Sequence, residues 1–326
     1  MIYRDHIYGE TEIIEPVILD LINCRSMQRL KGIDQHGYYQ PYFPHVDKVT
    51  RFDHSLGVFC LLQKFEAELD EQIAGLIHDV SHSAFSHCID YALGDSGARQ
   101  DHQDNIFEQY LEQSEIPQII KQHGFSLNHI KDETQFPLLE TTLPDLCADR
   151  IDYFLRDAVA SHEVTKDQAR NFLDKFKIVE NKWVLSDYQT AKQYAELFTK
   201  MNQTYWSGFT TATMHLAVGQ CLGYALRQSY ITLVDLYQTD QVVLDKIKER
   251  LSDDDCLVRL FKQMNNQVPV TNSQDQGLHV ANKSRVVDPL CLSDGSIHHV
   301  SQINPDWAKV VIEEKKPKEY CLVFEK

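Results

Sequence analysis

The sequence lacks the features that mark membrane-spanning and secreted proteins. No segment approaches ~18 consecutive apolar residues without a charge, so we expect no transmembrane helix. The opening residues, Met-Ile-Tyr-Arg-Asp-His, do not have the pattern of a signal peptide. The eight cysteines are scattered and form no CxxC motif, which favours reduced thiols. We therefore expect a cytoplasmic protein.

Positive charge is also scarce. The chain has 32 lysines and arginines against 48 aspartates and glutamates, which gives a net charge of −16. Because affinity for nucleic acid comes from lysine and arginine, an acidic chain without a basic stripe is not expected to bind nucleic acid tightly. A small phosphate substrate is compatible with this charge, since a bound cation and a few placed basic side chains reverse its sign locally.

The chain does have enough apolar residues for a large core. It is 326 residues long and 43% hydrophobic. Apolar periodicity predicts helices over residues 11–35, 51–68, 70–80, 103–113, 145–162, 188–237 and 240–263. A loop is predicted at 94–98, a β-hairpin at 176–186, and several strands with a helix near 305–314 after residue 284. We expect a mainly α fold, with a helical core over 1–275 and a small strand-containing α+β lobe over 276–326 packed on it.

The most informative feature is the pair His78-Asp79, which follows the apolar run 73–77. Two strong metal ligands beside core residues are costly to bury unless a cation binds them. His54 lies near the start of one predicted helix and His78 near the end of the next, so an antiparallel helical hairpin would bring them together. Asp149 opens a further run of acidic residues at helical spacing. These spacings indicate a metal-dependent hydrolase.

Each of these residues alone has a simpler interpretation. A single histidine is more often a core residue than a ligand, and the 149–157 segment alone is typical of a solvated amphipathic face. The ordered series favours a metal. Mixed imidazole and carboxylate ligands suit Fe, Mn, Co, Ni or Zn, and such a metal lowers the pKa of bound water and polarises a phosphoryl oxygen.

Phosphoryl hydrolysis also needs a leaving-group acid and neutralisation of charge. The histidines that follow the metal motif, His82, His87 and His102, are candidates for both tasks. Arg51 lies one helical turn before His54 and could bind a phosphate with a bidentate fork, as could Arg150 beside Asp149. A surface ion pair is the alternative role for either arginine.

This ordered series resembles the HD superfamily of metal-dependent phosphohydrolases. The closer resemblance is to its deoxynucleoside-triphosphate triphosphohydrolase branch, which includes the sterile-alpha-motif-and-HD-domain enzymes. The segments that carry the resemblance are residues 5–9, 28–30, 50–57, 73–82, 85–87, 152–157 and 285–290. The resemblance implies a helical HD-domain core, a dimer or tetramer, and cleavage of a dNTP to a deoxynucleoside and tripolyphosphate.

The resemblance also implies a role for each matching residue. The implied metal ligands are His54, His78, Asp79 and Asp149, with an additional Mg²⁺ as a further expectation. The implied phosphate contacts are Arg51, His82 and Arg150, with His87 and His102 near the scissile bond and Asp90 orienting a histidine. The implied sugar and substrate contacts are Gln35, Tyr153, Asp157 and Tyr205.

The chain departs from the family pattern at several of these places. Gln103 stands where the family has glutamate, Ser207-Gly208 where it has His-Lys, and His36 where it has leucine. Because Ser207 and Gly208 carry no charge, a phosphomonoesterase acting on nucleoside monophosphates or another small phosphoester is the alternative. A non-catalytic nucleotide-sensing protein is the alternative from another class, and the complete histidine and aspartate series argues against it.

Overall fold

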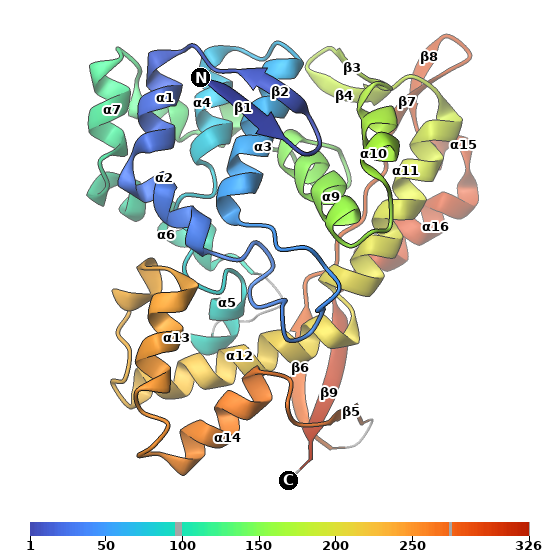
Figure 1. Ribbon diagram of the computed structural model, residues 1–326. Helices are drawn as coiled ribbons and strands as arrows, with labels where there is room; N and C mark the ends of the chain where they lie inside the picture. Colours follow the sequence, from blue (N-terminus) through green and yellow to red (C-terminus); the bar gives the residue numbers. More distant parts are fainter. Residues whose placement is uncertain (95–99, 274–275, 326) are drawn as a thin grey trace.

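The computed structural model describes residues 1–94, 100–273 and 276–325, so most of the predicted loop at 94–98 lies outside the described residues. Helices make up most of the molecule, and the two ends of the chain lie at opposite ends of it (Figure 1). This confirms the predicted mainly α fold. Among the described residues, no helix is both long enough and apolar enough to cross a membrane.

Three helices form the centre of the helical core. They are α3 (Arg51–Lys64), α4 (Leu69–Ile77) and α9 (Ala148–Ala160), and α3 packs against both of the others. The start of α3 is fixed by a capping box, in which the Thr50 hydroxyl accepts from the Asp53 backbone and the Asp53 carboxylate accepts from the Thr50 backbone. Helix α4 ends at Ile77, so His78 and Asp79 lie just beyond it rather than within the predicted helix 70–80.

Three of the long predicted helices are interrupted. The segment 11–35 contains α1 (Pro16–Asn23) and α2 (Arg25–Arg29), because Cys24 between them has an extended backbone. The segment 188–237 contains α11 (Tyr188–Met201), a π-helical turn at 202–206 and α12 (Phe209–Arg227). The break falls at Gly208, where a Cβ atom would lie 2.6 Å from the carbonyl oxygen of Gln203.

The third interrupted segment is 240–263. It contains α13 (Asp240–Lys248) and α14 (Asp255–Met264), since the Asp254 carboxylate caps a new helix by accepting from the Leu257 backbone. The remaining helices are α5 (Cys88–Ala92), α6 (His102–Gln113), α7 (Ile116–Gln122), α8 (Leu127–Ile130), α10 (Lys166–Leu173), α15 (Val300–Ile303) and α16 (Pro305–Glu314).

The strands form three small sheets at the edges of the helical core. The first pairs β1 (Ile2–Asp5) with β2 (Gly9–Glu12). The second has the order β3-β4-β7-β8, from β3 (Phe176–Val179), β4 (Lys182–Leu185), β7 (Leu290–Ser293) and β8 (Ser296–His299). The third has the order β5-β9-β6, from β5 (Val270–Asn272), β6 (Leu278–Asn282) and β9 (Lys318–Phe324).

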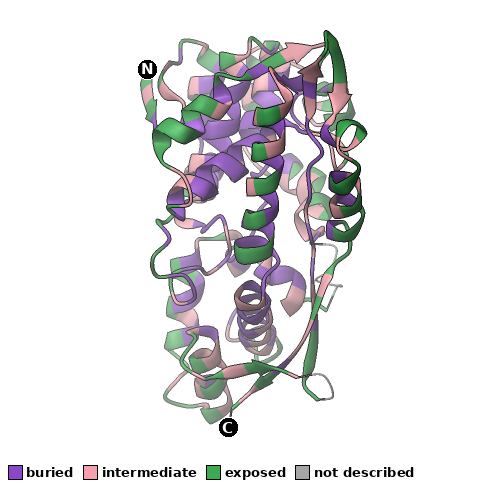
Figure 2. Cartoon of the chain, turned by 90° about the vertical axis from the view of Figure 1, so that its right-hand side faces the viewer, coloured by how far each residue is buried: buried purple, intermediate pink, exposed green. Residues whose placement is uncertain are grey.

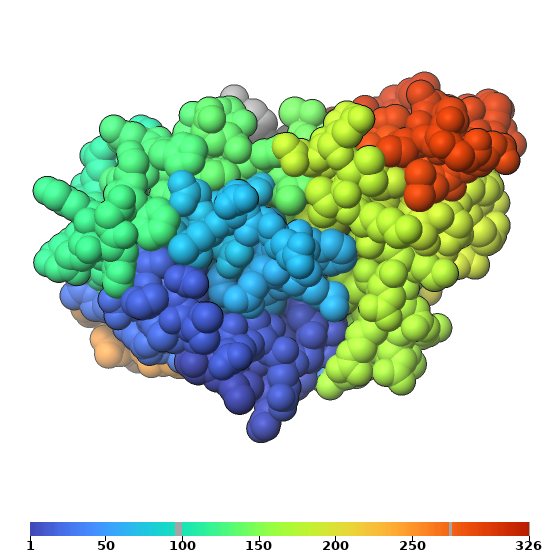
Figure 3. All heavy atoms as spheres, turned by 90° about the horizontal axis from the view of Figure 1, so that it is seen from above, coloured from blue at the N-terminus to red at the C-terminus, as the bar shows by residue number. Residues whose placement is uncertain are grey.

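The C-terminal strands are divided between two of these sheets. β7 pairs in parallel with β4 of the predicted hairpin, in the register Val184 to Leu290. The C-terminal residues accordingly lie beside the segment that follows residue 175 (Figure 3). β5, which precedes residue 275, pairs with β9 near the C-terminus. The division into domains at residue 275 stays a prediction.

Burial follows the inward faces of the central helices (Figure 2). One continuous apolar cluster runs from Ile7 to Val311 and includes residues of α3, α4, α9 and α12. Charged side chains are buried with it at the junction of α3 and α9, among them Asp152 and Arg156, which are 0% and 6% exposed. Because buried charges without partners are costly, these side chains require partners of opposite charge at this junction.

Candidate metal centre and adjoining cavity

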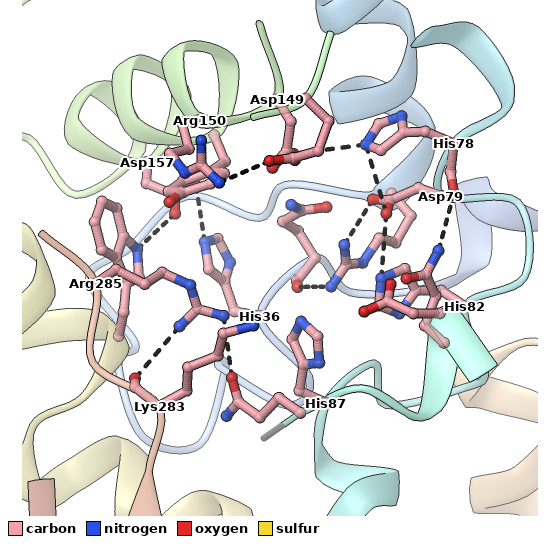
Figure 4. A pocket seen from close by; sticks show the side chains of 18 of the residues that line it. His36, His78, Asp79, His82, His87, Asp149, Arg150, Asp157, Lys283 and Arg285 are labelled. Carbon is pink, nitrogen blue, oxygen red and sulfur yellow. Dashed lines mark hydrogen bonds and ion pairs between the residues drawn. The ribbon is translucent and has the colours of Figure 1, made fainter. Parts of the chain in front are cut away.

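A cavity of about 350 Å³ is lined by residues of α3, α6, α9 and α12, of the segment between α4 and α5, and of the coil that follows β6. His78 and Asp79 lie on one side of it, Asp149 and Asp157 along α9, and Lys283 and Arg285 on another side (Figure 4). Residues far apart in the sequence therefore contribute side chains to a single space.

The four predicted metal ligands converge at one side of this cavity. The Nε2 atom of His54 lies 3.0 Å from Oδ1 of Asp149 and 3.2 Å from Nε2 of His78. The Oδ2 atom of Asp79 lies 3.6 Å from Nε2 of His54, and its Oδ1 atom lies 3.5 Å from Nε2 of His78. His54 comes from α3, His78 and Asp79 from the turn after α4, and Asp149 from the first turn of α9. The helical hairpin of α3 and α4 brings His54 to His78 and Asp79, and the packing of α9 against α3 adds Asp149.

The far side of each imidazole ring is held by an acceptor. The Nδ1 atom of His54 lies 2.7 Å from Oδ2 of Asp152, and Nδ1 of His78 lies 2.8 Å from the carbonyl oxygen of Gly75. A proton on each Nδ1 leaves Nε2 of both rings with a lone pair directed at the cluster. This is the arrangement that metal-binding histidines adopt.

Asp152 is itself fixed by a buried network. Arg156 donates to both of its carboxylate oxygens, at 3.0 and 2.8 Å, and the Tyr8 hydroxyl donates at 2.8 Å. Gly57 on α3 permits this approach, because a Cβ atom there would lie 2.0 Å from both Asp152 and Arg156. Sequence reasoning did not assign Asp152 a role, although the signal was present in its spacing from Asp149.

The charges in the cluster suit a cation. Burial alone would lower the pKa of His78, but the carboxylates of Asp79 and Asp149 raise it to about 10. Burial opposes ionisation of Asp149 and Asp79, yet the histidines hold the pKa of Asp149 below its usual range, and Arg51 holds that of Asp79 well below. A divalent transition metal would replace the protons on the imidazoles and keep the same carboxylates ionised. The donor set fits such a metal, and the additional Mg²⁺ stays a prediction.

The two arginines predicted to bind phosphate are already paired. Arg51 is 4% exposed and donates to Asp79 at 2.6 Å, to Ser86 and to the carbonyl oxygen of Gln35. Arg150 donates to Glu140 at 2.7 Å and to the carbonyl oxygens of Thr141 and Asp145.

Both arginines line the cavity, but their contacts are those of the alternative role, an ion pair. They are buried ion pairs rather than the surface pairs of that alternative. Neither guanidinium is free to direct a two-nitrogen fork at a phosphate in this arrangement.

Two of the accessory histidines face the cavity. The Nε2 atom of His82 lies 3.2 Å from Oδ1 of Asp79, and its ring packs edge-on against His87 with centroids 5.1 Å apart. The Nδ1 atom of His87 lies 3.6 Å from Oδ2 of Asp90, and the role of Asp90 in orienting a histidine stays a prediction. Burial lowers the pKa of both rings, so both are neutral at pH 7 in the free protein.

The third accessory histidine lies elsewhere. His102 is not among the described residues that line the cavity, and its Nε2 atom lies 3.2 Å from the Tyr237 hydroxyl. Because His102 starts helix α6, its backbone donates to Asp90 while its ring points to Tyr237, and Gln103 lines the cavity instead. The place of His102 near the scissile bond stays a prediction, and this arrangement does not support it.

Comparisons with known proteins identify the family of the chain. The HD domain family matches residues 51–157. The uncharacterized protein YdhJ of Bacillus subtilis is 33% identical over 292 residues, which covers 89% of this chain and 88% of that protein. The metal-dependent phosphohydrolase cns2 of Cordyceps militaris is 35% identical over 229 residues, 68% of this chain and 66% of that protein. The chain belongs to the HD superfamily of metal-dependent phosphohydrolases.

More distant similarities extend over the fold. A hypothetical protein of Aquifex aeolicus has a TM-score of 0.74 at 20% identity, covering 99% of this chain and 96% of that one. A phosphohydrolase of Bacteroides thetaiotaomicron has a TM-score of 0.67 at 17% identity, covering both chains fully. The deoxynucleoside triphosphate triphosphohydrolase SAMHD1 of Gallus gallus is 30% identical over 165 residues, 43% of this chain but only 26% of that protein.

The side of the HD cavity expected to hold the sugar is only partly as predicted. Gln35, Tyr153 and Asp157 line it, but Tyr205 does not, since its hydroxyl donates to Glu163 at 3.1 Å. The π-helical turn places Trp206 at the cavity instead, where its indole donates to Asp157 at 2.8 Å. Trp206 rather than Tyr205 therefore lines the cavity, and the contact of Tyr205 with substrate stays a prediction that this geometry does not support.

The described basic side chains at the cavity that were not predicted as site residues include His36, Lys283 and Arg285. The Nε2 atom of His36 lies 2.8 Å from Oδ1 of Asp157. Burial alone would lower the pKa of His36, but Asp157 and Asp34 raise it to about 9. Lys283 and Arg285 come from the coil after β6. Arg285 opens the matched segment 285–290, which was a usable signal, whereas Lys283 had none.

Proposed function

We propose that this HD protein hydrolyses deoxynucleoside triphosphates to a deoxynucleoside and tripolyphosphate. The observation that carries the proposal is the position of the His54, His78 and Asp149 group at one side of a cavity that also contains aromatic rings and cations. The similarity of the chain to several vertebrate deoxynucleoside triphosphate triphosphohydrolases supports the choice of substrate.

The cavity residues have separate roles in the proposed reaction. His54, His78, Asp79 and Asp149 would hold the metal, which supplies Lewis acidity and a water of lowered pKa. His87, neutral in the free protein and oriented by Asp90, accepts a hydrogen bond from substrate, or a proton when the charge of a phosphate raises its pKa. His82 is held by Asp79 at the same side of the cavity.

The aromatic side chains suit a nucleoside. The ring of Tyr153 packs edge-on against Trp206 with centroids 5.1 Å apart, and His36 stacks on Tyr39 at 4.2 Å. These rings provide flat apolar surfaces, and the Asp157 carboxylate beside them accepts hydrogen bonds from a sugar hydroxyl. The resemblance places Tyr153 and Asp157 at the sugar, which agrees with this surface.

A second candidate is a phosphomonoesterase that acts on nucleoside monophosphates. It is favoured by the ion pairs of Arg51 with Asp79 and of Arg150 with Glu140, which reduce the positive charge available to a triphosphate. The absence of charge at Ser207-Gly208 also favours a substrate with a single phosphate.

A product assay separates the candidates. Metal-analysed protein is incubated with Mn²⁺ and a panel of dNTPs, NTPs and dNMPs, and the products are separated by ion exchange. Tripolyphosphate with deoxynucleoside supports the first proposal, and orthophosphate from monophosphates alone supports the second. Asp149→Asn should abolish either activity, whereas Asp306→Asn, on a side chain that is 86% exposed, should not. Activity that survives Asp149→Asn contradicts both proposals.

A homo-oligomer and a cytoplasmic location stay predictions. Light scattering on the eluted protein gives the mass of the particle in solution. A mass equal to that of one chain at micromolar concentration would contradict the expected dimer or tetramer.

A further inference from the structure

The coil between β6 and β7 brings two basic side chains to the cavity without acidic partners. Among the described residues, the guanidinium of Arg285 donates only to neutral oxygens, at 3.0 Å to the side-chain amide of Gln100 and at 3.5 Å to the carbonyl of Lys283. The ammonium group of Lys283 makes no ion pair or hydrogen bond with a described residue. Neither of these cations is neutralised by a carboxylate of the described chain.

Leaving two half-buried cations together carries a cost. Burial and the nearby Arg285 lower the pKa of Lys283, which shows that the charges of the pair oppose each other. Arg51, Arg150 and Arg156, which are also buried near this cavity, each contact a carboxylate at 3.0 Å or less. Uncompensated cations lining a cavity are the arrangement of an anion-binding site.

The position of Lys283 and Arg285 in the cavity indicates which anion they bind. Lys283 and Arg285 lie on the side of the cavity away from His78 and Asp79 (Figure 4). We propose that Lys283 and Arg285 form a second phosphate subsite, which binds a phosphate group of the substrate other than the one attacked at the metal. The inference rests on the proposed function in one respect, namely that a phosphoester occupies this cavity.

The two side chains have complementary uses in such a subsite. The planar guanidinium of Arg285 can present two parallel N–H groups to phosphate oxygens, and the ammonium of Lys283 acts as a point charge. A substrate with a single phosphate would leave this subsite empty while that phosphate occupies the metal. The subsite therefore selects substrates with two or more phosphate groups, and it restores positive charge that Ser207-Gly208 do not provide.

Asp104 and Glu140 also line the cavity and raise the pKa of Lys283. If they rather than a phosphate neutralise Lys283 in solution, the subsite does not exist. Charge removal distinguishes these cases, because it weakens phosphate binding in one case and leaves it unchanged in the other.

The first experiment measures binding of inorganic tripolyphosphate to metal-free protein by calorimetry at low ionic strength. Removing one charge-assisted contact by Arg285→Gln or Lys283→Gln should weaken binding about tenfold or more. The charge-retaining Arg285→Lys should lose less. Lys309→Gln makes the same charge change at a side chain that is 79% exposed and should bind as the wild type does. Equal affinity in the Gln variants, or no binding by the wild type, overturns the proposal.

The second experiment uses the metal-loaded enzyme and compares substrates of different phosphate number. Arg285→Gln should raise KM for a nucleoside triphosphate about tenfold, change kcat by less than about threefold, and leave hydrolysis of a monophosphate unchanged. Equal losses on both substrates would contradict a separate subsite. Absence of all hydrolysis would contradict the proposed function alone, since tripolyphosphate binding to the metal-free protein is measured independently.

Discussion

Arg51 and Arg150, which belong to the helical core, differ from Lys283 and Arg285, which belong to the coil after β6, in how their charge is neutralised. The core arginines contact Asp79 and Glu140 at 2.6 and 2.7 Å, whereas the coil cations have no described carboxylate partner. The paired cations cannot respond to a ligand without breaking contacts that hold the metal side together. The cations of the helical core thus fix the structure of the site, whereas the cations of the coil remain available to bind a ligand.

The largest effect that tests this contrast is on stability. Arg51→Gln leaves the Asp79 carboxylate buried without its strongest partner, so the free energy of unfolding should fall by about 3–5 kcal/mol. Arg285→Gln removes no ion pair with a described residue but does remove the hydrogen bond to Gln100, and the change should stay below about 1.5 kcal/mol. Urea denaturation of the metal-free proteins measures both values.

The stabilities of Arg51→Gln and Arg285→Gln can contradict this contrast between the two regions. If Arg285→Gln destabilises the metal-free protein as much as Arg51→Gln does, the coil cation has a structural partner and the contrast between the two regions is lost. Far-ultraviolet circular dichroism of both variants would show whether their helix content matches the wild type.

The pairing of His36 with Asp157 predicts a pH dependence of intermediate size. Burial alone would lower the pKa of His36, but Asp157 and Asp34 raise it to about 9. Tyr39, which stacks on the His36 ring, is uncharged in this pH range. A raised pKa means that the stabilisation is fully present below the unfolded value of about 6.5 and is lost as pH rises through about 9. Its upper limit is about 3 kcal/mol.

His36→Gln should remove this part of the pH profile. Urea denaturation of the wild type between pH 6 and 10 should show falling stability, and the variant should show a smaller fall over the same range. His279→Gln, at a side chain that is 61% exposed, is the control and should keep the wild-type profile. Parallel profiles for wild type and His36→Gln would show that the ring is not held protonated.

The contrast between the two regions also explains which features could be predicted from the sequence. The helical core and the convergence of His54 with His78 and Asp79 follow local patterns, because helix periodicity and an antiparallel hairpin place these residues before any distant contact is known. Asp149 joins them through the packing of α9 on α3, and its role was implied by the family resemblance. The fold class is confirmed, while ligation by the four residues stays a prediction that the geometry supports.

The features that could not be predicted depend on contacts between distant segments. The glutamate that pairs with Arg150 is ten residues away across a turn, and no pattern distinguishes that pairing from a phosphate contact. The orientation of His102 depends on Tyr237, and the exchange of Tyr205 for Trp206 depends on a π-helical turn. Lys283 reaches the cavity only because β6 pairs with β9, a pairing set by strands more than 35 residues apart.

The smallest predicted effect concerns Asp152, the carboxylate through which the core positions a metal ligand. Asp152→Asn keeps the shape of the side chain but weakens the contact that fixes Nδ1 of His54, so metal affinity should fall about 10- to 100-fold. Competition against a chromogenic chelator measures this without any assay of activity. Asp167→Asn, at a side chain that is 89% exposed, should bind metal as the wild type does.

Because Arg156 retains Asp5 as a partner at 3.0 Å, the Asp152→Asn variant should remain folded, so a loss of metal affinity can be assigned to His54. Unchanged affinity would mean that packing alone orients the His54 ring, and the paired network of the core would then serve stability rather than the metal.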